Sequence, residues 1–245
     1  MKPDWTEPFT EPGSSIPVDG ESAVHVWAIG LTGSPAVLRT LLSADELESV
    51  GRLHFADDRR RYIAARGSLR QILGEYSGTP PAELRFCYGE RGKPCLESHS
   101  ALEFNLSHSG DIALLAVTRI GPIGIDVERV RPIEDLLGLA RRNFSRSEYE
   151  TLVDLPEAQH EDSFFRCWTR KEAYVKAVGD GLALSLDDFE VSFAPGDQAR
   201  FITIGGSKNE GCAWSLESLE PAAGYVGALA VRGQPTTLER WIWQH

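Results

Sequence analysis

The sequence predicts an α+β protein made of two similar halves, because one order of elements occurs twice along the chain. Each half runs from a strand through helices to several short strands. No repeat is visible residue by residue, so the repeated order itself carries the prediction. The two runs meet near residues 118–122. We therefore expect a flexible lead-in at residues 1–20, one half at 21–120 and a second half at 121–245.

The first half begins with AVHVWAIGL, which has the alternation of a strand. In SADELESVGRLHF, Ser43 and Glu46 are spaced as a capping box and indicate the start of a helix. The run DDRRRYIAARGSLRQILGEY continues as helix, with an apolar face at Leu69, Ile72 and Leu73. Two later runs, LRFCYGERGKPCL and LEFNLSHSGDIALLAVT, are expected to form strands interrupted by turn residues.

The second half opens with the apolar run GPIGIDVERVRP. FSRSEYETL then offers a second capping box, from Ser145 to Glu148. FFRCWTRKEAYVKAVGDGL predicts a strong helix that ends at its glycines. Four short strands are expected to follow in LDDFEVSF, ARFITI, CAWSLESLE and YVGALAV.

The composition is that of an ordinary globular protein, with 42% hydrophobic and 25% charged residues in 245. A net charge of −11 argues against broad binding to nucleic acid or to anionic membranes. The first residues are polar and rich in proline, and no apolar run reaches the ~18 residues of a membrane span. We expect a cytoplasmic protein whose four cysteines, Cys87, Cys95, Cys167 and Cys212, are small buried thiols in a reducing compartment.

Two carboxylates, Asp126 and Glu128, interrupt the apolar run that opens the second half. Side chains alternate between the faces of a strand, so these two point the same way while Ile125 and Val127 point the other way. Like charges side by side need compensation. Either solvent supplies it at a wet edge strand, or a cation is held between them.

A third carboxylate, Glu172, lies on the predicted helix with Lys176 one turn further on. Such a pair is commonly only a surface salt bridge that contributes about 0.3–0.5 kcal/mol. Here a stripe that includes Phe164 and Trp168 runs beside it, which would partly shelter the carboxylate. Glu172 is therefore a candidate third oxygen ligand for a hard cation such as Mg²⁺.

Basic residues supply possible partners for phosphate in this acidic chain. His108, in FNLSHSGDIALLAV, fits a structural histidine, a hydrolase base or a phosphate ligand. The nucleophile elbow GxSxG is absent, and Ser107 and His108 would point apart in a strand, which argues against the hydrolase. Lys93 lies in a glycine-flanked turn. Metal ligands together with cations, which also include Arg59, Arg66 and Lys176, indicate phosphoryl transfer.

Four motifs occur in order between residues 91 and 177, namely GKP, FNLSHSGD, GIDVE and WTRKEAYVKA. They resemble the motifs GKP, FNxSHS, GxDxE and WxxKEAxxK of the 4′-phosphopantetheinyl transferases, specifically the larger Sfp-like type. The flanks also fit, back to about Phe55 and on to LSLDDFEV. One such motif would be weak, whereas four in order at family-like spacing are specific.

The resemblance implies the fold of that family, a monomer of two α+β halves in a pseudo-twofold arrangement with the active site in the cleft between them. It also implies a reaction. The 4′-phosphopantetheine group of coenzyme A would pass to a serine of an apo acyl or peptidyl carrier protein, with release of 3′,5′-ADP. The partners would then be coenzyme A and a carrier protein, without nucleic acid or membrane.

By the same resemblance, Mg²⁺ (or Mn²⁺) would be held by Asp126, Glu128 and Glu172. The phosphates of coenzyme A would be bound by Lys176, His108 and Lys93, and Ser107 would help to seat the donor. Glu172 or a water molecule would take the proton of the acceptor serine. Arg59 and Arg66 would face the 3′-phosphate, although Arg60 or Arg61 could take the place of Arg59.

Two other functions stay open at this point. A metal-dependent phosphodiesterase or nucleotide hydrolase would use the same three carboxylates, and turnover of coenzyme A without a carrier protein would favour it. A non-catalytic module would bind coenzyme A without transfer. The intact set Asp126, Glu128 and Glu172 argues against such a module.

Overall fold

The computed structural model describes residues 9–11, 22–90, 92–99, 101–179 and 184–244. Most of the predicted lead-in at residues 1–20 therefore lies outside the described residues. Of that segment, Thr10 forms a parallel bridge with Trp241. Its backbone N–H donates to Arg240 O at 3.1 Å, and Ile242 N donates to Thr10 O at 2.8 Å.

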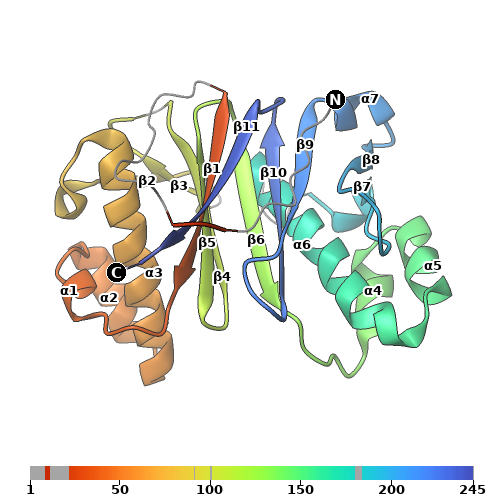
Figure 1. The fold of residues 1–245 in the computed structure, drawn as a ribbon, viewed down its shortest axis with the longest axis horizontal. Helices are drawn as coiled ribbons and strands as arrows, with labels where there is room; N and C mark the ends of the chain where they lie inside the picture. The colour runs from red at the N-terminus through yellow and green to blue at the C-terminus, as the bar shows by residue number, and fades with distance from the viewer. Residues whose placement is uncertain (1–8, 12–21, 91, 100, 180–183, 245) are drawn as a thin grey trace.

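The first sheet has four strands in the order β11-β1-β5-β4 (Figure 1). Their bounds are Ala23–Gly30 for β1, Glu103–Ser109 for β4, Ile112–Thr118 for β5 and Thr237–Trp243 for β11. β1 pairs with β5 and β5 with β4 in antiparallel register, whereas β1 and β11 are parallel. The expected division near residue 120 stays a prediction, and the topology adds an exchange, because β11 follows the second half but joins the first sheet.

Three helices cover the outer face of this sheet. They are α1 (Ala36–Arg39), α2 (Ala44–Arg52) and α3 (Ala56–Ser77), and Gly78 ends α3 with φ +66°. The 3₁₀ turn η1 (Pro81–Glu83) then leads to the small hairpin β2 (Phe86–Tyr88) and β3 (Pro94–Leu96). The predicted apolar face of α3 is confirmed, since Leu69, Ile72 and Leu73 are fully buried in the core beneath the sheet.

The second sheet has three antiparallel strands in the order β6-β10-β9. They are β6 (Ile123–Arg129), β10 (Tyr225–Arg232) and β9 (Trp214–Leu219). Around them lie α4 (Leu136–Asn143), α5 (Arg146–Asp154), η2 (Glu157–Gln159) and α6 (His160–Val178). The remaining elements are η4 (Leu186–Asp188), the hairpin β7 (Phe189–Val191) and β8 (Phe201–Ile204), and α7 (Lys208–Cys212).

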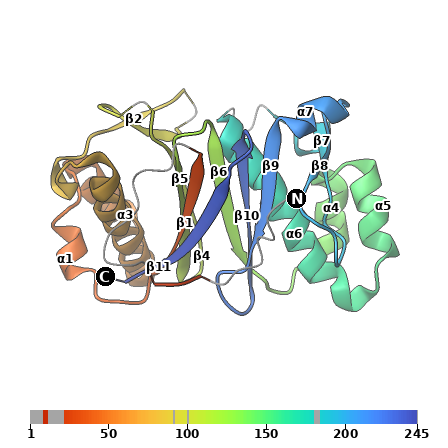
Figure 2. The ribbon, with the colours of Figure 1, turned by 45° about the horizontal axis from the view of Figure 1, so that its top comes forward.

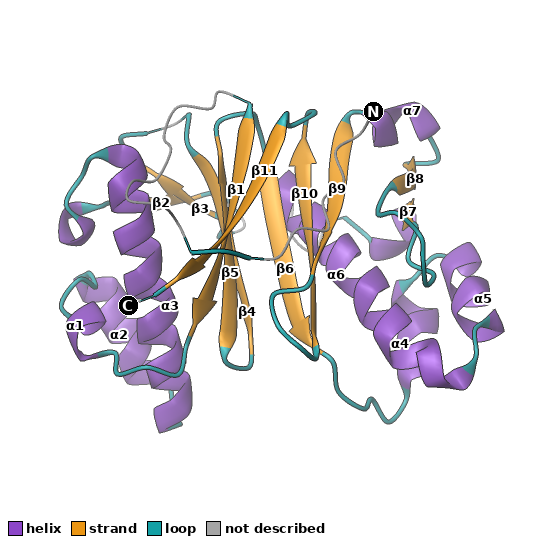
Figure 3. Cartoon of the chain, in the orientation of Figure 1, coloured by secondary structure: helices purple, strands orange, loops and turns teal. Residues whose placement is uncertain are grey.

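The two sheets lie face to face between two outer layers of helices (Figures 2 and 3). Residues of β1 and β5 that point away from α3, such as Val26 and Leu114, share a buried cluster with Ile125, Val127 and Leu229 of the second sheet. The other face of the second sheet packs on α6. On β6, Asp126 and Glu128 alternate with Ile125 and Val127. The two apolar side chains therefore pack between the sheets, and the two carboxylates lie on the face that packs on α6.

The predicted α+β fold of two similar halves is confirmed. The strand order β1-β5-β4 of the first half corresponds to β6-β10-β9 of the second. A long helix, α3 or α6, packs on each sheet, and a short hairpin follows each helix. Both predicted capping boxes are present, Ser43 with Glu46 and Ser145 with Glu148.

Each half contains an equivalent buried ion pair, which joins its capping-box glutamate to a cation of its long helix. Glu46 accepts from Arg70 of α3 at 2.7 Å, and Glu148 lies 2.7 Å from Lys171 of α6. Both cations also donate to two carbonyls of the segment after their helix: Arg70 to Pro81 O and Leu84 O, and Lys171 to Leu186 O and Phe189 O. The glutamate of each capping box therefore fixes its short helix onto the long one. Sequence reasoning found the capping boxes but not these partners.

The prediction of four small buried thiols is wrong for Cys87 and Cys95. Cys87 and Cys95 lie directly opposite each other in the β2–β3 hairpin, with Cα atoms 5.1 Å apart, and form a disulfide. Antiparallel partners bring their Cβ atoms within reach of one another, so a tight hairpin supplies the geometry that spacing in the sequence does not reveal. Cys167 is a buried free thiol, as predicted. Cys212 is free but exposed, so the prediction of burial is wrong for it.

This pairing predicts a stepwise alkylation pattern. Without reductant, one cysteine of the native protein should react, namely Cys212, and two should react after unfolding. After reduction and unfolding, all four should react. Intact mass after iodoacetamide treatment counts the adducts. Four adducts without reductant would contradict the disulfide.

A buried histidine gives the first half a pH-dependent stability. His25 is 6% exposed, and its Nδ1 lies 2.6 Å from the hydroxyl of Tyr76. Trp27 Nε1 donates to the same hydroxyl at 3.1 Å, so the single Tyr76 proton is free to be donated to His25. Nδ1 is then an acceptor and the ring is neutral. Burial lowers the pKa of His25 to about 4.

We expect the free energy of unfolding to fall as the pH drops below about 6.5, because His25 then binds a proton in the unfolded chain but stays neutral in the folded protein. Above pH 6.5 the contribution of neutral His25 to the free energy of unfolding is fully present. At pH 5 about 2 kcal/mol of this contribution should be lost. Urea unfolding at pH 7.5 and pH 5 measures this loss, and His25→Gln should remove that part of the pH dependence. An equal loss in wild type and variant would contradict the assignment.

Within the described ranges, no helix combines the length and the apolar character that a membrane span requires.

Candidate active site

The two carboxylates of β6 differ in exposure and in their partners. Asp126 is 5% exposed, and its Oδ1 accepts from Ser107 Oγ at 2.9 Å and from Lys176 Nζ at 2.6 Å. Its second oxygen, Oδ2, is buried without a hydrogen-bond partner in the structure. Glu128 is partly exposed, and its Oε2 accepts from Ser109 Oγ at 2.7 Å. A buried carboxylate oxygen without a donor is unusual and suits a cation.

A close approach of α6 to β6 brings the other predicted residues to these carboxylates. Gly124 makes it possible, since a Cβ there would lie 2.1 Å from Ala173 O and 2.3 Å from Ala177 N. Glu172 and Lys176, one turn apart on α6, therefore lie beside Asp126. Lys176 Nζ also donates to Ser107 Oγ at 2.9 Å, so the lysine and the serine share Asp126 Oδ1.

The electrostatics of this cluster are negative overall, with three carboxylates around one ammonium group. Burial raises the pKa of Asp126, against the effect of Lys176 and Ser107. Burial and then the charge of Asp126 raise the pKa of Glu172, and Lys176 again opposes the shift. The charge of Glu128 also raises the pKa of both Asp126 and Glu172. A divalent cation would relieve this repulsion.

The cluster fits a hard cation by its chemistry, with oxygen ligands, excess negative charge and the orphaned Asp126 Oδ2. Its side chains are not already arranged as ligands, because among the described residues no three His, Cys, Asp or Glu side chains form a ready metal-binding group. The ammonium of Lys176 occupies Asp126 Oδ1 instead. The assignment of Asp126, Glu128 and Glu172 to a metal stays a prediction.

His108 lies on β4 between Ser107 and Ser109, and as expected for a strand it does not share their face. The serines contact the carboxylates of β6, whereas the His108 side chain is exposed. Although the side chain is exposed, neighbouring protein atoms displace part of the water around the ring. This desolvation, followed by the positive charges of Lys176 and Arg61, lowers the pKa of His108. The ring is therefore held toward its neutral form while it lies in the field of Lys176.

Lys93 joins the two halves. Its Nζ donates to Ile123 O of β6 at 2.9 Å and to Ala177 O of α6 at 3.2 Å, and it lies 3.9 Å from Glu103 Oε2. Burial lowers the pKa of Lys93. The ammonium group thus holds the β2–β3 hairpin against the start of β6 and the last turn of α6. Its predicted contact with a phosphate would compete with these carbonyls.

The two predicted arginines are placed differently. Arg66 is paired with the buried Glu46 at 2.6 Å, and its guanidinium lies 4.8 Å from the ring centre of Phe86. Arg59 is exposed near the start of α3, and its contact with Leu53 O is long, at 3.4 Å. The structure does not bring Arg59 into the carboxylate cluster, so its role at a 3′-phosphate stays a prediction.

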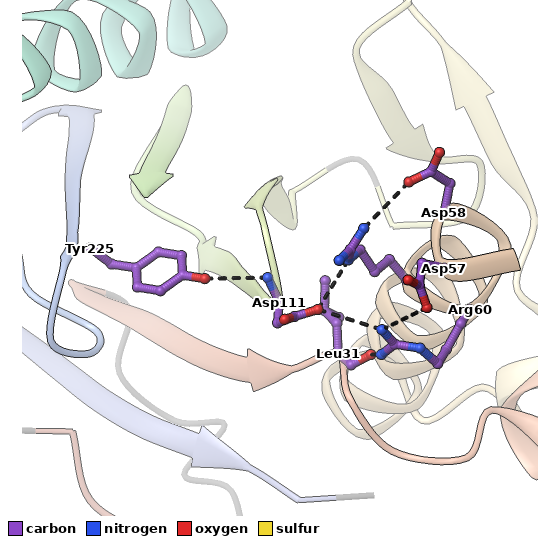
Figure 4. A network of polar contacts seen from close by, with 7 residues as sticks. Leu31, Asp57, Asp58, Arg60, Asp111 and Tyr225 are labelled. Atoms are coloured by element: carbon purple, nitrogen blue, oxygen red, sulfur yellow. Dashed lines mark hydrogen bonds and ion pairs between the residues drawn. The ribbon is translucent and has the colours of Figure 1, made fainter. Parts of the chain in front are cut away.

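The alternatives to Arg59 are held by Asp111 in the turn after β4. Arg61 Nε donates to Asp111 Oδ1 at 3.0 Å, and Arg60 Nη2 lies 3.6 Å from the same oxygen. Figure 4 shows Asp111 between Arg60 and Tyr225, whose hydroxyl accepts from Asp111 N at 3.3 Å. Arg60 also donates to Leu31 O. These contacts fix the turn to α3 on one side and to β10 on the other.

A groove of about 640 Å³ lies beside the cluster, and both halves line it. From the second half come Trp168, Glu172 and Lys176, and from the first come Lys93 and Leu106. A second groove of about 530 Å³ shares Gly92, Pro94, Asn105 and Leu106 with it and continues toward Arg52, Tyr62, Arg66 and Tyr88. The two grooves form one elongated surface, with Glu172 and Lys176 at one end and, at the other, Arg52 and Arg66 together with Asp45 and Glu48.

Sequence reasoning missed three contributors to this site, Asn105, Ser109 and Tyr88. The alternation of β4 was a usable signal for the first two, because residues 105, 107 and 109 share one face of a strand. Tyr88 carried no such signal, since its position depends on the hairpin.

Comparison with known proteins agrees with the motifs. The family described as 4′-phosphopantetheinyl transferase superfamily matches residues 122–230, and the one described as 4′-phosphopantetheinyl transferase, N-terminal, matches residues 34–119. The 4′-phosphopantetheinyl transferase HetI of Nostoc sp. (strain PCC 7120) is 45% identical over 216 residues, which cover 86% of this chain and 88% of the relative. The 4′-phosphopantetheinyl transferase psf-1 of Bacillus pumilus is 33% identical, covering 76% and 77%.

Among solved structures, a holo-(acyl-carrier-protein) synthase from Bacillus anthracis in complex with CoA (3′,5′-ADP) is 24% identical. It has a TM-score of 0.37 and covers 45% of this chain and 94% of its own. The sequence matches are far more extensive. On the identity and coverage of these relatives, the chain belongs to the 4′-phosphopantetheinyl transferase superfamily.

Proposed function

We propose that this protein transfers the 4′-phosphopantetheine group of coenzyme A to a serine of an apo acyl or peptidyl carrier protein and releases 3′,5′-ADP. One observation carries the proposal. Glu172 and Lys176 of one family motif line the groove between the halves, and Lys176 Nζ lies 2.6 Å from Asp126 Oδ1 of another family motif. The relatives named as 4′-phosphopantetheinyl transferases support the same reaction.

We infer that Asp126, Glu128 and Glu172 hold Mg²⁺, with Mn²⁺ as a substitute. Bound there, the ion would draw negative charge from the pyrophosphate of coenzyme A and ease displacement at phosphorus. The buried Asp126 Oδ2 and the mutual repulsion of the carboxylates support this assignment. Mn²⁺ has the same charge and the same preference for oxygen ligands.

The protein's own residues would position the reactants. Lys176 can exchange its contact with Asp126 for a phosphate oxygen, and His108, on the opposite face of β4 from Ser107 and Ser109, would donate to another phosphate of coenzyme A. The serine oxygen of the carrier attacks the phosphorus nearest the pantetheine arm. The bond from that phosphorus to the bridging oxygen breaks, and 3′,5′-ADP leaves. The serine proton goes to Glu172 or to a water molecule.

The elongated groove fits the shape of coenzyme A. The end with Arg52 and Arg66, which Asp45 and Glu48 also line, would take the nucleotide, and the end with Glu172 and Lys176 would take the pyrophosphate. In this arrangement Arg66 would have to share its guanidinium between Glu46 and the 3′-phosphate. We further propose that the protein acts as a monomer in the cytoplasm without nucleic acid or membrane, as the net charge of −11 and the family's two-halved type suggest.

The test is the intact mass of an apo carrier protein after incubation with this protein, coenzyme A and Mg²⁺. We expect the addition of one phosphopantetheinyl group, and no addition when the metal is chelated. Fatty-acid, polyketide and peptide carriers should each be tried. If none is modified while coenzyme A is consumed, a metal-dependent hydrolase replaces the transferase. If coenzyme A stays intact, a binding module replaces it.

A further inference from the structure

Side chains, in place of a backbone ladder, join the two sheets beside the candidate active site. β4 belongs to the first sheet and β6 to the second. Three residues of one face of β4 reach β6: Asn105 Oδ1 accepts from Ile125 N at 2.9 Å, and Ser107 and Ser109 donate to the two carboxylates. Because partner numbers rise together along both strands, β4 and β6 run in the same direction.

Ser109 makes two contacts within this set. Its Oγ donates to Glu128 Oε2 at 2.7 Å and accepts from Arg129 N at 3.1 Å. Glu128 has one other partner for this oxygen, the exposed Arg131, at the longer distance of 3.4 Å. Ser109 thus connects the Glu128 carboxylate to the backbone of its own strand, which restricts the rotamer of the glutamate.

The position of Ser109 is itself fixed. The next residue, Gly110, has φ +55°, and a Cβ there would lie 2.7 Å from the hydroxyl of Tyr225. Tyr225 pairs with Arg129 in the β10–β6 ladder, and its hydroxyl accepts from Asp111 N (Figure 4). The turn after β4 therefore rests against the end of β6. This support places the Ser109 hydroxyl at Glu128 before any ligand binds.

We propose that Ser109 is a positioning residue, which holds Glu128 in the orientation needed to bind the metal together with Asp126 and Glu172. The inference rests on the proposed function for its metal. Partners that orient metal-binding side chains commonly change metal affinity by about 10–100-fold when removed. A serine that merely stabilised the seam between the sheets would change the melting temperature and leave metal affinity unaltered.

The experiment measures Mn²⁺ binding by the loss of the free Mn²⁺ signal in electron paramagnetic resonance, with coenzyme A and without carrier protein. We expect Ser109→Ala to weaken Mn²⁺ binding by about 10-fold. Ser109→Thr, which keeps the hydroxyl, should bind Mn²⁺ nearly as tightly as wild type. Ser109→Val, which has the shape of threonine but no hydroxyl, should bind Mn²⁺ as weakly as Ser109→Ala. If the alanine variant does not fold, the threonine and valine pair gives the answer.

Ser215→Ala is the matched control. Ser215 lies on β9 of the second sheet and donates to Gly233 O at 2.8 Å, so its loss removes a strand serine's hydrogen bond away from the carboxylates. It should leave Mn²⁺ binding unchanged. In the transfer assay, Ser109→Ala should raise the Mg²⁺ concentration for half-maximal rate, with most of the rate recovered at high Mg²⁺.

Wild-type affinity in both the alanine and valine variants would overturn the inference and leave the proposed function intact. Failure of the wild-type protein to modify any carrier or to bind Mn²⁺ would instead count against the proposed function, and the role of Ser109 at a metal would fall with it.

Discussion

Replacement of Asp126 by Asn is expected to lower the rate of phosphopantetheinyl transfer by about 10²–10³-fold or more. The amide keeps the shape of the side chain but removes the charge that a cation and Lys176 both need. Little stability should be lost, because burial of the Asp126 carboxylate is unfavourable in itself and Lys176 can turn to solvent. The two effects separate a functional carboxylate from a structural one.

The measurement is the initial rate of carrier modification by intact mass, with the melting temperature beside it. Glu150→Gln is the control, because Glu150 forms only an exposed pair with Arg146 on α5. It should leave both quantities unchanged. If Asp126→Asn retained more than a tenth of wild-type activity, the carboxylate would not hold a metal during the reaction.

Replacement of Lys171 by Met is expected to destabilise the fold by about 3–5 kcal/mol. The side chain is fully buried, and its loss leaves the Glu148 charge without its cationic partner and removes the Lys171 donor from Leu186 O and Phe189 O. For a protein of this size such a loss corresponds to a fall of about 10 °C in melting temperature. Urea unfolding followed by circular dichroism gives the free energy directly.

The double variant Glu148→Gln/Lys171→Met tests the reason for that loss. With the charge removed from both partners, part of the stability should return relative to Lys171→Met alone. Arg70→Met should behave like Lys171→Met in the first half, since it leaves the buried Glu46 with Arg66 alone. A loss below 1 kcal/mol for Lys171→Met would show that water replaces the ammonium group.

Much of the fold followed from local sequence rules. The capping boxes at Ser43 and Ser145 placed two helices, because their chemistry lies within four residues. The alternation around Asp126 was sufficient to put both β6 carboxylates on one face. Glu172 was a candidate third ligand from its place on the predicted helix, and the family resemblance implied the same set. The structure supplies the physical condition for its approach in Gly124.

Features that depend on distant pairing did not follow. The disulfide needs the register of a hairpin, which eight residues of sequence separation do not specify. The buried partners of Arg70 and Lys171 needed the packing of α2 on α3 and of α5 on α6. The helical stripe of Phe164 and Trp168 does not reveal which backbone carbonyls Lys171, one turn further along α6, will reach.

The parallel pairing of β11 with β1 also bears on how the chain folds. Trp241 and Trp243 of β11 pack on Trp27 of β1, with ring centres 4.6 and 5.6 Å apart. The ribosome makes β11 only after the whole second half, so the nascent first sheet has an open edge and an incomplete core until then. Such non-local pairing slows folding. We therefore regard the two halves as one cooperative unit, whose first half completes its structure last although it is synthesised first.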